Sequence, residues 1–107
     1  MTAEERFAVL VEALVGRDGV TAGSAKRGFG SNALQVNGRI FAMVSHRRLV
    51  FKLPRERVAT LIAGGEGAPY DAGKGRPLAE WVVLKEAAQE RSEALAEEAI
   101  KFVGRSR

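Results

Sequence analysis

The sequence contains no cysteine and a single histidine, His46. Without cysteine, the chain can have no disulfide framework, no thiolate zinc or iron–sulfur site and no cysteine nucleophile. A single histidine also excludes most histidine-based metal sites. We therefore expect no metal site and no cofactor, and because no motif assigns catalytic residues either, we do not expect an enzyme.

Long hydrophobic runs are also absent. No apolar stretch approaches the ~20 residues that a membrane-spanning helix needs. The chain starts with acidic residues, and Glu12 interrupts the apolar stretch from Phe7 to Val15, which is unlike a secretory signal. We expect a cytoplasmic protein that does not bind a membrane.

The composition is that of an ordinary globular domain. Of the 107 residues, 46% are hydrophobic and 28% are charged, so disorder and fibrous structure are excluded. This length is typical of one domain, so we expect residues 1–107 to form a single domain.

The net charge of +4 is unevenly distributed. Residues 19–55 contain no carboxylate and seven basic residues, namely Lys26, Arg27, Arg39, Arg47, Arg48, Lys52 and Arg55. Such asymmetry is typical of a surface that binds nucleic acid or an acidic partner. The alternative is that these side chains point in several directions and are balanced by the acidic last helix.

Hydrophobic periodicity predicts three helices, at 2–15, 54–62 and about 86–103. Thr2 and Glu5 have the spacing of a capping box. Strands are expected at 33–36, 39–44, 49–53 and 78–84, with a further short edge strand around 68–71. Within 39–44, we expect Phe41 and Met43 to share one face of the sheet.

Two turns connect the first three strands. Asn37-Gly38 is a strong hairpin signal, because both residues tolerate the positive φ of a type I′ turn, and residues 45–48 are expected to form the next turn. The element order is α-β-β-β-α-β-β-α. It indicates an α+β two-layer sandwich, in which helices pack on an antiparallel sheet of four to five strands.

Two glycine-rich segments, 64–67 and 73–76, superficially resemble phosphate-binding loops. Neither has the spacing of a nucleotide-binding motif, and a strand rather than a helix follows the second. Turn glycines are the better interpretation. The alternative is a small-anion site near residues 73–77, formed by backbone N–H groups with Lys74 and Arg76.

Candidate contacts to nucleic acid or another anion are the basic residues near the hairpins and glycine turns: Lys26, Arg27, Arg47, Arg48, Lys74 and Arg76. Phe29 or Tyr70 could stack on bases, whereas Phe41 and Phe51 are expected in the core. We interpret His46 as an exposed turn residue and Trp81 as part of the core or a dimer interface. A sheet face without helices would mark a partner contact.

Several segments together resemble one family. They are Phe29-Gly30, 33–42, 49–54, 67–70, 75–78 and Glu80-Trp81. In order and spacing they are similar to the TfoX N-terminal domain family and the related MmcQ/YjbR-like proteins. The resemblance implies a fold like that of secretion chaperones and no catalytic activity. Better-known members are linked to regulation of natural competence, and YjbR-like relatives have been proposed to bind DNA.

Three hypotheses for function follow. The first is a non-enzymatic interaction module, with regulation as one potential role, that binds a protein partner or forms a homodimer through its sheet face or a strand edge. The second is a nucleic-acid-binding module that uses the basic segment 19–55. The third is a domain that binds a small anionic ligand near residues 73–77.

Overall fold

The computed structural model describes residues 2–17, 19–22, 33–71, 75 and 77–105. In chain order, the elements are α1 (Ala3–Leu14), β1 (Val20–Ala22), β2 (Ala33–Val36), β3 (Arg39–Ser45), β4 (Arg48–Lys52), α2 (Arg55–Ala63), β5 (Gly67–Pro69), β6 (Trp81–Leu84), the 3₁₀ helix η1 (Glu86–Arg91) and α3 (Ser92–Arg105).

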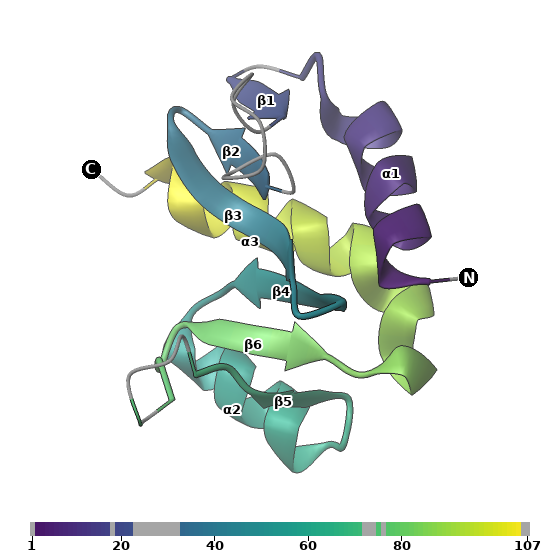
Figure 1. Ribbon diagram of the computed structural model, residues 1–107. Coiled ribbons are helices and arrows are strands. Elements are labelled where there is room, and N and C mark those ends of the chain that lie inside the picture. The colour runs from purple at the N-terminus through teal and green to yellow at the C-terminus, as the bar shows by residue number, and fades with distance from the viewer. Residues whose placement is uncertain (1, 18, 23–32, 72–74, 76, 106–107) are drawn as a thin grey trace.

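The strands form one antiparallel sheet in the order β1-β2-β3-β4-β6-β5 (Figure 1). The expected α+β sandwich is confirmed, but the sheet has six strands rather than four to five. The additional strand is β1, in which Val20 pairs with Val36 and Thr21 with Gln35. The expected strand at 78–84 is also shorter, because only Trp81–Leu84 pairs with β4.

The helices pack on one side of the sheet, which we call the inner face. Figure 1 shows α3 behind the middle of the sheet, α1 along one side and α2 beside β5 and β6. One hydrophobic core joins them to strand residues such as Leu34, Leu49, Phe51, Val82 and Leu84. The helices contribute Phe7, Leu10, Leu14, Val58, Leu61, Leu95, Ala99 and Val103.

Because side chains alternate along a strand, residues adjacent to these core positions point to the opposite side, which we call the outer face. In the central strands the outer-face residues include Met43, Arg48, Val50, Lys52, Trp81 and Val83. Val50 is buried, but it does not belong to the core that the helices share. No helix of the described residues packs against the outer face.

A β-bulge in β3 changes the predicted alternation. Leu34 pairs with Ala42 and the next residue, Gln35, pairs with Ile40, so Phe41 has no opposite residue. The extra residue turns both Phe41 and Ala42 into the core, where both are fully buried. Met43 is only half-buried and lies outside this core, so the expectation that Phe41 and Met43 share a face is wrong.

The helix ends follow local sequence signals. The capping box of α1 is present, because the backbone N–H of Glu5 donates to Thr2 Oγ1 and that of Thr2 donates to Glu5 Oε1. The last helix differs from the expectation, since residues 86–91 form a 3₁₀ helix before α3 begins at Ser92.

Candidate binding surface on the outer face

The turn between β3 and β4 adopts a backbone conformation that is unusual for its residues. His46 and Arg47 have φ values of 52° and 65°, similar to the 53° and 82° of Asn37 and Gly38 in the preceding hairpin. Asparagine and glycine adopt this left-handed conformation readily, whereas a long side chain such as arginine is strained there. The second hairpin therefore carries two long side chains at its tip at the expense of backbone energy.

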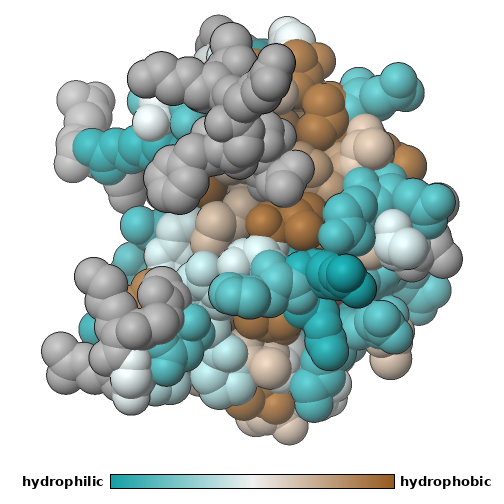
Figure 2. All heavy atoms as spheres, in the orientation of Figure 1, coloured by the Kyte–Doolittle hydropathy of each residue, from teal (hydrophilic) through white to brown (hydrophobic). Residues whose placement is uncertain are grey.

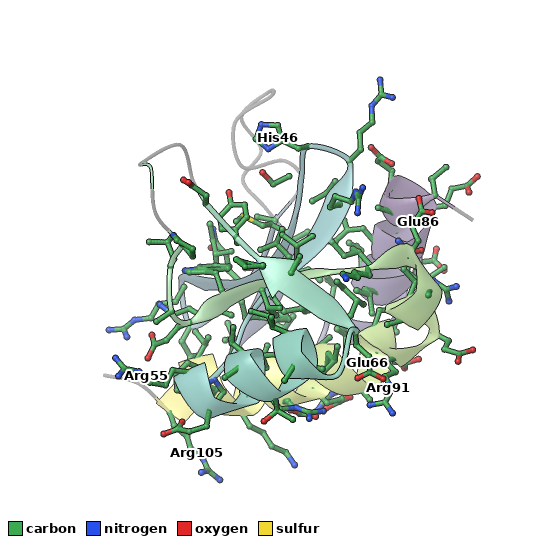
Figure 3. All side chains as sticks on the ribbon, turned by 90° about the horizontal axis from the view of Figure 1, so that it is seen from below. His46, Arg55, Glu66, Glu86, Arg91 and Arg105 are labelled. Carbon is green, nitrogen blue, oxygen red and sulfur yellow. The ribbon has the colours of Figure 1, made fainter. Side chains whose placement is uncertain are left out.

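Figure 3 places His46 on the side of the sheet opposite α2 and α3, and Arg55 and Arg105 on the helical side. The same turn lies toward the viewer in Figure 2, where hydrophilic side chains gather over the β3–β4 hairpin. His46, Arg47 and Arg48 are all exposed. The turn thus extends the outer face with three nitrogen-rich side chains.

A connected row of side chains crosses the outer face. Ser45 Oγ lies 3.2 Å from His46 Nδ1 and 3.3 Å from the Tyr70 hydroxyl. The Tyr70 ring is tilted against Trp81, with the ring centroids 6.3 Å apart. Lys52 Nζ lies 5.6 Å from the centroid of the Trp81 ring, within the range of a cation–π contact. We call Ser45, His46, Lys52, Tyr70 and Trp81 the outer-face cluster.

Four separate parts of the chain build this cluster. Ser45 ends β3 and His46 follows it, Lys52 ends β4, Tyr70 directly follows β5, and Trp81 begins β6. The register pairs Lys52 with Trp81 across β4 and β6, which brings the ammonium group to the indole ring. Tyr70 and Trp81 are both half-buried, so their rings remain partly accessible to solvent.

The sheet and the helices differ in charge. The six strands contain no aspartate or glutamate, and their charged residues are Arg39, Arg48 and Lys52. Most of the carboxylates lie on the helices, and two of them on α3, Glu97 and Glu98, form ion pairs, as does Glu66 in the turn after α2. Arg57 Nε and Nη2 donate to Glu98 at 2.9 and 3.2 Å, and Arg91 Nε lies 3.2 Å from Glu66 Oε2.

Arg17 also pairs with a carboxylate on α3. Its hydrogen bond to Glu97, together with the charge of that carboxylate, raises the pKa of Arg17 further above its ordinary value. By contrast, neither Arg47 nor Arg48 forms an ion pair within the described residues. Within this part of the chain, the charges of Arg47 and Arg48 are therefore not neutralised by a carboxylate.

The structure describes only two of the six residues that the sequence predicted as contacts to nucleic acid or another anion. Arg47 and Arg48 lie together at the β3–β4 turn, whereas Lys26, Arg27, Lys74 and Arg76 lie outside the described residues. The proposed small-anion site at 73–77 falls largely there as well, and it stays a prediction.

The other strand cations of the basic segment do not gather at that turn. Arg39 begins β3 and Lys52 ends β4, so both lie at the opposite end of the hairpin strands from Arg48. Four residues along a strand separate Arg48 from Lys52 by about 13 Å. The cations that the structure describes on the strands are therefore spread along the sheet rather than concentrated at one point.

Sequence reasoning missed the central part of the cluster. Of the two places expected for Trp81, the core is wrong, because the alternation in β6 places Val82 and Leu84 in the core and Trp81 on the outer face, while the dimer interface stays a prediction. Ser45 and Lys52 were not singled out as contact residues. The sequence offers no signal for the face of Trp81, because Trp81, Val82, Val83 and Leu84 are all apolar and only their burial in the structure shows which of them face the core.

The requirements of a metal cluster and of a membrane-spanning helix are not met within the described residues. They contain no group of three or more histidine, aspartate or glutamate side chains that could hold a metal ion. None of their helices is both long and apolar enough to cross a bilayer.

The comparison with known families matches this architecture. The family model of the TfoX N-terminal domain covers residues 18–102, which includes every strand, α2, η1 and most of α3. The chain therefore belongs to the TfoX N-terminal domain family, as the resemblance of its hairpin segments implied. No curated protein and no solved structure matches the chain.

Proposed function

We propose that this domain is a non-enzymatic binding module that contacts an anionic macromolecule through its outer face. The observation that carries the proposal is the contrast between the two faces: helices occupy one, while the other presents cations and two accessible aromatic rings without a strand carboxylate. Membership of the TfoX N-terminal domain family supports a regulatory or competence-related role for such a module.

Charge favours a different partner over a second copy of the chain. A two-fold dimer through the outer face would bring Arg47, Arg48 and Lys52 of both copies together, and like charges at an interface are costly. Pairing through strand edges is also poorly supported. Each edge strand has only three residues, and β5 contains Pro69, which has no N–H to donate.

Catalysis is not part of the proposal. Ser45 and His46 are in contact, but they are neighbours on an exposed turn, where water screens their interaction. Their hydrogen-bond row continues to Tyr70, a group that can donate to or accept from a ligand. The cluster is therefore suited to binding and positioning a ligand.

The test compares two double charge reversals that change the net charge equally. Arg48→Glu/Lys52→Glu alters the outer face, and Lys101→Glu/Arg105→Glu alters the helical side. We expect the outer-face variant to elute from a heparin column at clearly lower salt than the helical-side variant, since binding to a polyanion depends on local positive charge. Equal elution of the two variants would show that net charge alone governs binding and would refute the proposal.

A further inference from the structure

The outer-face cluster combines two kinds of group that occur together in few types of binding site. Trp81 and Tyr70 supply adjacent aromatic rings, with centroids 6.3 Å apart. Lys52 lies against one of these rings, and Arg47 and Arg48 lie at the turn that carries His46 and Ser45. The hydroxyl groups of Ser45 and Tyr70 connect the aromatic pair to the turn through contacts of 3.2 and 3.3 Å.

We propose that the partner of this surface is single-stranded nucleic acid. Bases would stack on Trp81 and Tyr70, while Lys52, Arg48 and Arg47 would contact backbone phosphates. This inference rests on the proposed function, because it names the class of anionic macromolecule that the outer face binds.

Each component of the cluster fits this ligand. Aromatic side chains on a sheet stack on unpaired bases, and they tolerate any sequence because every base has a π-face. The cations at the two ends of β4, about 13 Å apart, can follow a backbone that crosses the sheet. Tyr70, Ser45 and His46, which are in contact in this order, provide hydroxyl and imidazole groups for base edges or phosphate oxygens.

Two other anionic ligands would use only part of the cluster. Duplex DNA keeps its bases stacked inside the helix, so it would engage Arg47 and Arg48 at the hairpin tip and leave Trp81 and Tyr70 unused. An acidic peptide would match the charges but would bring a π-face only where it carries an aromatic residue. An unpaired strand carries a base beside every phosphate, so it uses the rings and the cations together.

The chain contains one tryptophan, so the intrinsic fluorescence of Trp81 reports directly on the cluster. We would titrate the full chain with an oligothymidylate of about 12 nucleotides, a usual site size for single-strand binders. We expect saturable quenching of Trp81. Three phosphate contacts should weaken the affinity on the order of 20-fold between about 50 and 200 mM salt, since the log–log slope is about −0.7 per contact on a single strand.

Two substitutions test the aromatic contribution. Tyr70→Leu removes one ring while keeping the Trp81 probe, and Trp81→Leu is followed by anisotropy of a labelled oligonucleotide. Loss of a stacked base weakens binding between about 5-fold and 100-fold. Trp81→Phe is the matched control, which keeps a ring and should retain most of the affinity. Circular dichroism of each variant separates loss of binding from loss of folding.

Titrations with a duplex and with polyglutamate test whether the surface prefers single-stranded nucleic acid. If a duplex of the same length binds at least as tightly as the single strand, or if Tyr70→Leu and Trp81→Leu bind normally while folded, the inference is overturned. If polyglutamate quenches Trp81 and the oligonucleotide does not, the ligand is an acidic polypeptide: the single-strand inference fails while the proposed function stands. Equal heparin elution of the two charge-reversal variants would instead refute the proposed function itself.

Discussion

The two faces of the sheet differ in how their side chains are used. On the inner face, Phe51, Val82 and Leu84 are fully buried against helices. On the outer face, Trp81 and Lys52 lie in the same strands but are only half-buried, and their contacts are polar or aromatic. One set of strands therefore supplies stability on one side and a binding surface on the other.

The comparison explains why the outer face can carry strained and charged groups. The inner face and the helices bury most of the large apolar side chains, so the outer face contributes less to holding the sheet together. The positive φ values of His46 and Arg47 illustrate this freedom, since the turn tolerates a conformation that suits glycine better. Four predictions test this division, from the largest expected effect to the smallest.

Truncation of the inner face should be the most damaging change. Phe51→Ala removes a fully buried ring from the core and should lower the free energy of unfolding by about 3–5 kcal/mol. Met43→Ala on the outer face should lower it by about 1 kcal/mol, the usual size for substitutions outside a core. Urea denaturation measures both values, and similar losses would contradict the division between the faces.

Two glycines test how closely the elements pack. A Cβ at Gly67 would lie 2.6 Å from Val82 Cγ2 and 3.4 Å from Leu61 Cβ, so Gly67→Ala should destabilise the fold by about 1–3 kcal/mol. A Cβ at Gly104 would lie 3.6 Å from Val36 Cγ2, an ordinary contact. Because glycine weakens a helix, Gly104→Ala in α3 should stabilise the protein by about 0.5–1 kcal/mol. Thermal unfolding of both variants would show opposite shifts, and shifts of the same sign would argue against this packing.

Substitutions in the β3–β4 turn should raise the stability of the protein and weaken its binding to a polyanion. Replacing His46 and Arg47 by Asn and Gly provides the residues that a type I′ turn prefers, so stability should rise by about 1 kcal/mol. The same variant loses two nitrogen-rich side chains and should elute from heparin at lower salt. A turn variant that binds as strongly as the original chain would remove this turn from the binding surface.

The smallest expected effect is a pH dependence at the start of α1, far from the outer face. The hydrogen bond from the Thr2 backbone N–H lowers the pKa of Glu5 below its ordinary value. The folded state therefore favours ionised Glu5, so this stabilisation is present above the ordinary pKa and is lost as the pH falls through the lowered one. Unfolding measured from neutral to acid pH should show a smaller acid-induced loss in Glu5→Gln than in the original chain, while heparin elution at neutral pH stays similar.

Local features were predictable from the sequence. The capping box at Thr2 and Glu5, the Asn37-Gly38 turn and the three helical segments depend on residues close together in the chain, and all are present. The six segments that resemble the TfoX N-terminal domain family also pointed to the correct family. Short-range hydrogen bonding and apolar periodicity were sufficient for these features.

Features that depend on strand register were not predictable. The bulge that turns Phe41 into the core arises from pairing between β2 and β3. Residues 20–22 form the strand β1 because they pair with the free edge of β2. The core position predicted for Trp81 is wrong for the same reason, since its face depends on how β6 pairs with β4. A shift of one residue in register would exchange the two faces of a strand.

The sequence by itself determined the kinds of element, their order and the family, because these depend on neighbouring residues and on periodicity along the chain. It also determined the absence of carboxylates from 19–55. Only the tertiary structure decided that Lys52, Tyr70, Trp81 and Ser45 meet on one face. The physical reason is that their contacts join separate strands, so they exist only when strand order, register and the position of the helices are all in place.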